Sequence, residues 1–246
     1  CHTPYGSKTS KPKPLLENHT GMFDNYDLNA RMQFGFLGGT RKDVACVRFH
    51  TQVTIDNQVV QLRSHNSHLF VVMTNECQYE ESLGILFTKD VLESLGQDTV
   101  PIGYFMNSIQ SYFIKGLRLD AHTAIRPLTS YDMQYMQANF FGGSSTVSRQ
   151  SFSKFWSWFG KVLHRIRYQR HMTSLWCQGL IYGMISRDAV HRLLMSRPDG
   201  SFMLRFSESF QGSIAVAYRV EGGVKNYLIK QEDTLGNAKS VADFLK

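Results

Sequence analysis

The sequence is poor in cysteine. Its 246 residues include four cysteines, at positions 1, 46, 77 and 177, and none of them forms a Cys-x-x-Cys pair. No set of cysteines and histidines has the spacing of a zinc site, so no structural metal is expected. Free, buried thiols are typical of proteins in a reducing compartment such as the cytosol or the nucleus.

Motifs of the common enzyme classes are also missing. There is no Gly-x-x-x-x-Gly-Lys phosphate loop, no Gly-x-Ser-x-Gly elbow and no His-Glu-x-x-His motif. No cysteine is followed six positions later by an arginine, as the nucleophile of a tyrosine phosphatase requires, and the nine histidines do not cluster. The sequence therefore predicts a binding protein rather than an enzyme, with no cofactor.

Long apolar runs are absent as well. No stretch is long enough to cross a bilayer, so a membrane partner is not expected. The chain begins with Cys1 rather than Met, and we expect it to be a piece of a longer protein.

The composition favours folded domains over disorder, since hydrophobic residues make up 42% and aromatic residues 13% of the chain. The net charge of +7 is compatible with nucleic acid, but it is spread along the chain and supports DNA binding only weakly. One dense basic run is predicted to be a solvated helix face: Lys161, His164, Arg165, Arg167 and Arg170.

Three regions differ in hydrophobic pattern, and we place their boundaries at 1–79, 80–172 and 173–246. The first region has β patterns. After a flexible basic segment, short strands and a basic turn around Gly38–Lys42 are expected. The strands are predicted at 28–37, 44–53, 58–63 and 68–75.

The second region has helical patterns, with helices predicted at 83–95, 101–115 and 130–139. A longer helix is expected to be capped by Ser151 and to end near Arg170, with one apolar face: Phe152, Phe155, Phe159, Leu163 and Ile166. The aromatic cluster of Trp156, Trp158 and Phe159 resembles a ligand cage, but packing in a helical core is the preferred interpretation.

The most informative stretch is residues 200–209, Gly-Ser-Phe-Met-Leu-Arg-Phe-Ser-Glu-Ser. Alternate residues of a strand share a face, so one face is expected to enter the core: Phe202, Leu204 and Phe206. Arg205 and Ser207 then lie on the other face, just before a turn rich in hydroxyls. The planar fork of an arginine gives two parallel hydrogen bonds to a phosphate, although a salt bridge at the surface is the alternative for Arg205 taken alone.

A helix is predicted upstream of this strand. Ser186 is a plausible N-cap, and Val190, Leu193 and Leu194 recur at helical spacing. Arg187 lies in the first turn, where the helix dipole disfavours a cation, so an anion is expected nearby. Neutralisation of Arg187 by Asp188 is the alternative. Two more strands, at 213–220 and 225–230, and a second helix from Ser240 are predicted downstream.

Two segments closely resemble the Src-homology-2 domain of the STAT transcription factors. They are residues 176–187, Trp-Cys-Gln-Gly-Leu-Ile-Tyr-Gly-Met-Ile-Ser-Arg, and the Leu-Arg-Phe-Ser-Glu-Ser segment that follows them. Residues 70–78 resemble the end of the STAT DNA-binding domain, and residues 152–159 resemble the last helix of the STAT linker. The resemblance runs from about Leu28 to the C-terminus and is weaker over 90–145.

The resemblance implies a multidomain, mixed fold. It comprises part of an all-β immunoglobulin-like DNA-binding domain, an all-α linker domain and an α+β Src-homology-2 domain. In the last domain, by resemblance, Arg205 takes a phosphotyrosine phosphate, Arg187 helps to clamp it, and Ser207, Glu208 and Ser209 line the loop that closes over it. Because a carboxylate cannot donate to a dianion, Glu208 is expected to brace Arg205 or the loop amides.

DNA contacts are implied at two places. Asn75 matches the asparagine through which STATs approach bases, and Thr40, Arg41 and Lys42 match a loop that contacts the phosphate backbone. An alternative for Asn75 is that it satisfies local backbone groups at the end of a strand. Leu83–Phe87 replaces the tryptophans that family members usually carry, which indicates a diverged member.

The partners implied are the phosphotyrosine segment of a second copy or of a receptor, double-stranded DNA and an upstream tyrosine kinase. The protein would lie in the cytoplasm and move to the nucleus on activation. A phosphotyrosine-binding adaptor that does not bind DNA is the alternative function.

Overall fold

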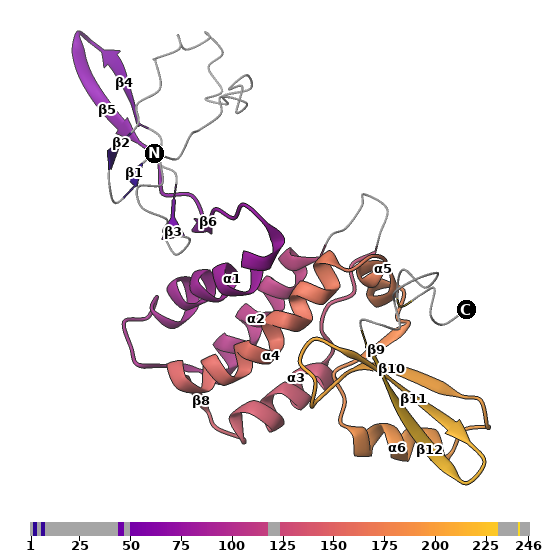
Figure 1. Cartoon of the computed structure of the whole chain (residues 1–246). Helices are drawn as coiled ribbons and strands as arrows, with labels where there is room; N and C mark the ends of the chain where they lie inside the picture. The colour runs from indigo at the N-terminus through magenta and orange to yellow at the C-terminus, as the bar shows by residue number, and fades with distance from the viewer. Residues whose placement is uncertain are drawn as a thin grey trace. The chain divides into compact units, whose positions relative to one another are not determined.

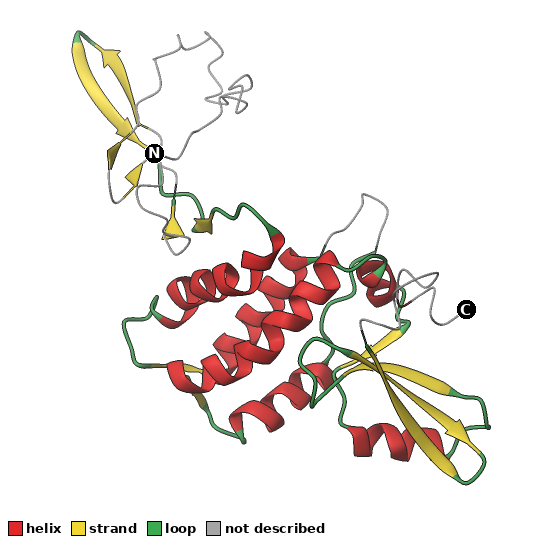
Figure 2. Cartoon of the chain, in the orientation of Figure 1, coloured by secondary structure: helices red, strands yellow, loops and turns green. Residues whose placement is uncertain are grey.

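The structure is a computed structural model of the chain, and it describes residues 2–3, 6–7, 44–46, 50–117, 124–230 and 241. The chain divides into two compact units, Cys1–Val72 and Met73–Lys246 (Figure 1). The first unit contains strands and no helix among its described residues, whereas the second contains both helices and a sheet (Figure 2).

The first unit consists of short antiparallel pairs. Its strands are β1 (His2–Thr3), β2 (Gly6–Ser7), β3 (Val44–Ala45), β4 (His50–Ile55), β5 (Gln58–Arg63) and β6 (Phe70–Val71). Strand β1 pairs with β2, β3 with β6, and β4 with β5. Asp56 and Asn57 join β4 to β5 with positive φ angles of 49° and 62°, the backbone that a two-residue hairpin turn requires.

The predicted strand at 58–63 is confirmed. The run at 44–53 is interrupted rather than continuous, because β3 ends at Ala45 and β4 begins at His50. The run at 68–75 is a strand only at Phe70–Val71, since Asn75 instead caps a short 3-10 helix. The predicted strand at 28–37 and the basic turn with Thr40, Arg41 and Lys42 lie outside the described residues.

The second unit begins with a helical region. Its helices are η1 (Glu76–Gln78), α1 (Tyr79–Phe87), η2 (Thr88–Leu92), α2 (Ile102–Gly116), α3 (Ser130–Met136), η3 (Gln137–Phe141), α4 (Arg149–Tyr168) and α5 (Met172–Cys177). Two short strands, β7 (Thr99–Pro101) and β8 (Thr146–Ser148), pair antiparallel and join the loop before α2 to the loop before α4. The region is thus two helix–loop–helix units bridged through their loops.

Helix α4 begins three residues earlier than the predicted cap implies. Ser148, not Ser151, is the N-cap, and the two serines form a capping box in which each side chain accepts from the other's backbone N–H. The sequence Ser-x-x-Ser is compatible with a cap at either serine, so the pattern alone does not distinguish Ser148 from the predicted Ser151. The predicted apolar face is buried, and Trp156, Trp158 and Phe159 pack in the core rather than forming an open cage.

The basic run at 161–170 is only in part the solvated face that the sequence predicts, since Lys161 and Arg170 are exposed whereas Arg165 and Arg167 are half-buried. Arg167 donates to the carbonyl of Gly116 at 2.9 Å, and its guanidinium lies over the rings of Tyr79 and Tyr168 at 5.4 and 5.6 Å. Burial also lowers the pKa of Arg165. The long aliphatic stems of arginine allow this packing, because they cover apolar surface as well as carrying charge.

A four-stranded sheet follows, in the order β12-β11-β10-β9. Its strands are β9 (Ile181–Gly183), β10 (Phe202–Phe206), β11 (Ile214–Val220) and β12 (Gly223–Ile229). Strand β9, which no sequence pattern predicts, runs parallel to β10, and the other pairs are antiparallel. Helix α6 (Arg187–Met195) packs on one face of the sheet. Val241, the described residue of the predicted second helix, is helical and buried.

The two faces of β10 enter different cores, as the alternation predicts. Leu204 and Phe206 are buried with Trp176 in the core shared with the helical region, whereas Met203 packs against the small cluster under α6. Phe202 is the exception, because it is 58% exposed. It lies opposite Tyr218 at the start of the strand.

Arg126 fixes the helical region to the sheet. Its guanidinium donates to the carbonyls of Ile181 at 2.5 Å and Tyr182 at 2.7 Å, and it lies 4.2 Å from the ring of Trp176. The free edge of β9 is thereby covered by a side chain that supplies the missing donors.

Asp132 makes a second connection between the two. One carboxylate oxygen accepts from the N–H of Met184 at 2.7 Å, and the other accepts from the N–H of Thr129 at 2.8 Å in the capping box of α3. Gly183 has a φ of +131°, and a Cβ there would collide with Asp132. A glycine is therefore required for this close approach. Across the described residues, no helix is long and apolar enough to cross a membrane.

We predict that Asp132→Ala lowers the free energy of unfolding of the second unit by about 2–4 kcal/mol, because it removes a helix cap and leaves a buried N–H unpaired. Tryptophan fluorescence during urea denaturation measures this, since Trp156, Trp158 and Trp176 all belong to the second unit. Asp98→Ala, in an exposed loop, is the matched control and should change the midpoint little. Equal midpoints for the two variants would contradict the assigned role of Asp132.

Candidate functional site

Arg205 is a buried cation at the end of β10. Its side chain is 5% exposed, Nη1 donates to the carbonyl of Phe206 at 3.1 Å, and the nearest carboxylate, that of Glu208, is 4.0 Å from Nη1. The Nε atom is buried and has no hydrogen-bond partner. Burial lowers the pKa of Arg205, since desolvation disfavours the charged form. The protein therefore compensates this guanidinium only in part.

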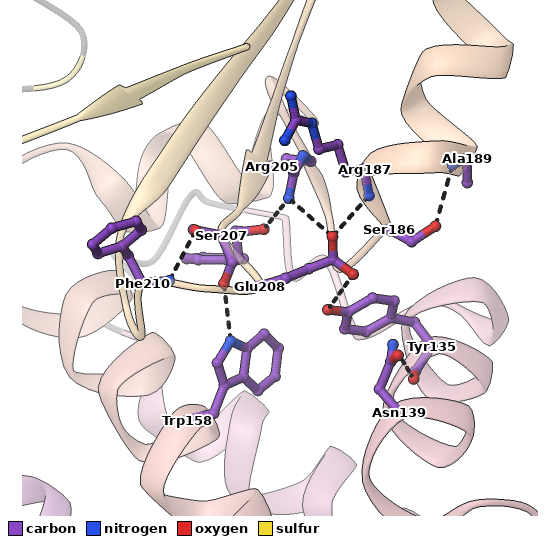
Figure 3. Close-up of polar contacts among 11 residues, drawn as sticks. Tyr135, Asn139, Trp158, Ser186, Arg187, Ala189, Arg205, Ser207, Glu208 and Phe210 are labelled. Atoms are coloured by element: carbon purple, nitrogen blue, oxygen red, sulfur yellow. Dashed lines mark hydrogen bonds and ion pairs between the residues drawn. The ribbon is translucent and has the colours of Figure 1, made fainter.

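The N-terminus of α6 lies beside this guanidinium (Figure 3). Ser186 is the N-cap, as predicted, and its hydroxyl accepts from the N–H of Ala189 at 3.2 Å. The N–H of Arg187 donates to Glu208 at 2.9 Å, so the anion expected near this helix start is Glu208. The side chain of Arg187 is exposed, and its charge acts on Arg205.

The loop that follows β10 carries the predicted hydroxyls. Ser207 is buried, and its Oγ accepts from the N–H of Phe210 at 3.1 Å, which leaves its own hydrogen to donate. Ser209 is exposed. The backbone N–H groups of Glu208 and Ser209 donate to no group in the described part of the chain. Two arginines, a helix N-terminus and two loop amides without a partner among the described residues thus lie on neighbouring elements, an arrangement that suits an anion with several acceptor oxygens.

Two residues of the helical region reach this site, although no sequence pattern predicts them there. The hydroxyl of Tyr135, on α3, is 3.5 Å from Glu208, and the indole N–H of Trp158, on α4, donates to the carbonyl of Ser207 at 3.0 Å (Figure 3). Burial and the negative charge of Glu208 raise the pKa of Tyr135, so its hydroxyl remains a donor at neutral pH. Nothing in the sequence links residues so far apart.

Asn75 has a local role in the structure. It caps η1, and its Oδ1 accepts from the N–H of Cys77 at 3.0 Å and from its thiol at 2.6 Å. Its side chain is exposed, but a base contact through Oδ1 requires these bonds to open. Contact with DNA remains a prediction for Asn75, and Thr40, Arg41 and Lys42 lie outside the described residues.

Three family models match successive parts of the chain. A STATa immunoglobulin-like domain matches residues 2–73, an EF-hand fold domain matches 75–169, and an SH2 domain matches 180–243. They support the predicted fold class of an immunoglobulin-like part, a helical region and an SH2 part.

The EF-hand match describes the fold of the helical region rather than a calcium site. A calcium-binding loop needs several oxygen ligands, including a bidentate glutamate. The loop at 142–148 contains no Asp or Glu, and Glu93 of the other loop pairs with Lys89 at 2.6 Å and Arg149 at 2.9 Å. Among the described residues, no three His, Cys, Asp or Glu side chains are grouped so as to hold a metal ion.

Two relatives from Dictyostelium discoideum cover most of the chain. Signal transducer and activator of transcription A is 39% identical over 222 residues, which is 89% of this chain and 31% of the relative. Signal transducer and activator of transcription B is 32% identical over 259 aligned residues, which is 95% of this chain and 22% of the relative. The chain thus spans about a third or less of the length of these relatives.

Arg205→Met is expected to raise the free energy of unfolding of the second unit by about 1 kcal/mol, because an apolar side chain of similar length replaces an undercompensated buried cation. Inorganic phosphate is expected to raise the melting temperature of the wild type but not of this variant. Arg187→Met, at an exposed position, is the stability control. A large loss of stability in Arg205→Met would show that the cation is fully paired in the folded protein.

Proposed function

Because this chain belongs to the family of signal transducers and activators of transcription (STATs), we propose that it is part of a signal-dependent transcription factor that binds phosphotyrosine. The family is one of binding proteins rather than enzymes, as the sequence predicts. We divide the chain into a DNA-binding part at 1–79, a linker at 80–172 and an SH2 domain at 173–246.

The observation that carries the proposal is the unpaired Nε of Arg205, buried beside a helix N-terminus. A phosphate dianion offers two acceptor oxygens to the guanidinium fork and compensates its charge. Arg187 can clamp the phosphate from the first turn of α6, while Ser207 and Ser209 donate hydroxyls from the loop. Glu208 cannot donate, and its contacts with Arg205 and the N–H of Arg187 support its expected role as a brace.

The phosphotyrosine would come from a second copy or from a receptor, after an upstream tyrosine kinase has acted. When two copies exchange these segments, the contact is reciprocal and gives a two-fold dimer. We propose that the dimer moves from the cytoplasm to the nucleus and binds DNA through Asn75 and the segment with Thr40, Arg41 and Lys42.

A phosphotyrosine-binding adaptor without DNA binding is the second candidate. The observation that favours it is the local role of Asn75, whose Oδ1 is already engaged by Cys77. The two candidates differ in whether the protein binds DNA.

Phosphotyrosine binding is tested by isothermal calorimetry. The chain is titrated with the tightest binder selected from short peptides that carry a fixed central phosphotyrosine and randomised flanks. Arg205→Ala is expected to weaken binding by at least about 30-fold and Arg205→Lys by nearly as much, because lysine lacks the fork. Arg192→Ala, exposed on the same helix α6, should bind like the wild type. Equal affinity for the unphosphorylated peptide would refute the proposal.

DNA binding is tested on the tyrosine-phosphorylated protein with duplexes selected from random sequence. A palindromic site and a steep decrease of affinity with salt are expected. Asn75→Ala is expected to weaken binding to the selected site by about 5- to 100-fold with an unchanged salt dependence, as for a base contact. If phosphopeptide binding is intact and no duplex is selected, the adaptor is the correct function.

A further inference from the structure

We infer that the helical region contributes to phosphotyrosine binding. Its residues Trp158 and Tyr135 are positioning residues, which hold the phosphate-binding loop, residues 207–212, in the conformation that binds phosphate. The inference rests on the proposed function, since it concerns the same site. It assigns a role in ligand binding to residues that lie outside the SH2 match, at 135 and 158.

The loop has few bonds of its own. The N–H of Ser207 donates to the carbonyl of Ser213 at 2.8 Å, and the N–H of Ser213 donates to the carbonyl of Phe210 at 3.1 Å. The Oγ of Ser207 accepts from the N–H of Phe210. These bonds define a turn but leave the amides of Glu208 and Ser209 unpaired within the described residues. A loop that presents free amides to a ligand needs support from outside to keep them in place.

Helix α4 supplies most of this support. The bond from the indole of Trp158 to the carbonyl of Ser207 is buried on both sides, since these residues are 3% and 5% exposed. One turn further along, Lys161 donates to the side chain of Gln211 at 2.7 Å. Gly212, with a φ of +72°, lies so close that a Cβ would be 2.9 Å from the Cβ of Lys161. The loop is therefore held against α4 at its first residue and at its last two.

Helix α3 supports the acidic residue of the loop. The hydroxyl of Tyr135 lies 3.5 Å from one oxygen of Glu208, and the other oxygen accepts from the N–H of Arg187 at 2.9 Å. Burial and the charge of Glu208 raise the pKa of Tyr135, so the phenol is protonated at neutral pH and can donate to the ionised carboxylate. Glu208 thus joins three elements: the loop, the start of α6 and the linker helix α3 (Figure 3).

Such support acts on affinity through preorganisation. A free loop must lose conformational entropy when it closes on a phosphate, whereas a loop that is already held has lost that freedom on folding. Loss of one supporting hydrogen bond should therefore weaken phosphopeptide binding and speed dissociation, although neither Trp158 nor Tyr135 needs to touch the phosphate. A contact that only stabilises the fold would lower the melting temperature and leave the affinity of the folded protein unchanged.

The test compares Tyr135→Phe with Tyr131→Phe. Both variants lose one hydroxyl from α3, but Tyr131 lies one turn earlier and is 69% exposed. Calorimetry and stopped-flow dissociation use the selected phosphopeptide, at a temperature where each variant is folded by fluorescence. Tyr135→Phe and Trp158→Phe are each expected to raise Kd about threefold to tenfold, mainly through faster dissociation, whereas Tyr131→Phe stays at the wild-type value.

A double-mutant cycle shows whether Tyr135 acts through Glu208. In a Glu208→Ala background, Tyr135→Phe should change Kd no further. Wild-type affinity in both Tyr135→Phe and Trp158→Phe, with Arg205→Ala still defective, would overturn this inference and leave the proposed function intact. If Trp158→Phe does not fold, Tyr135→Phe and the cycle decide the question alone. Failure of the wild type to prefer the phosphorylated peptide would refute both the proposed function and this inference.

Discussion

The guanidinium of Arg205 has to remain charged while it is buried, and the neighbouring elements are arranged around that requirement. Strand β10 fixes its direction, the start of α6 presents a helix N-terminus, and Glu208 lies 4.0 Å away rather than in hydrogen-bond contact. A closer carboxylate would pair the charge fully and leave little for a ligand. Because its charge is compensated only in part, the guanidinium is tolerated in the folded protein and can still bind an anion.

The helical region has the fold of an EF-hand domain without the ligands of a calcium site among its described residues. Its two helix–loop–helix units and the β7–β8 bridge match an EF-hand fold, yet the second loop contains no carboxylate at all. Glu93, which could serve as a ligand, is neutralised by Lys89 and Arg149. In the loop that begins at Glu93, ion pairs therefore occupy the place that a metal ion has in a calcium-binding protein.

Local patterns in the sequence are sufficient to predict most of the helices and strands of the SH2 part. Alternation along β10 placed Arg205 on the face opposite Leu204 and Phe206, and Ser186 was identified as a cap from its position before an apolar stripe. Strand β9 was missed because it is three residues long and is defined by its pairing with β10. Tyr135 and Trp158 were missed at the site because they lie 73 and 49 residues from their partners, which no local pattern encodes.

The close approach of Asp132 to Gly183 has an evolutionary consequence. A change at either position alone should cost stability. Any side chain at 183 meets the carboxylate of Asp132, and a residue at 132 without a side-chain acceptor leaves the N–H of Met184 unpaired. The two positions lie in different parts of the sequence, one in the linker and one at the entrance to the SH2 sheet. Exchange of either part between relatives by recombination should therefore keep full stability only when both positions are inherited together.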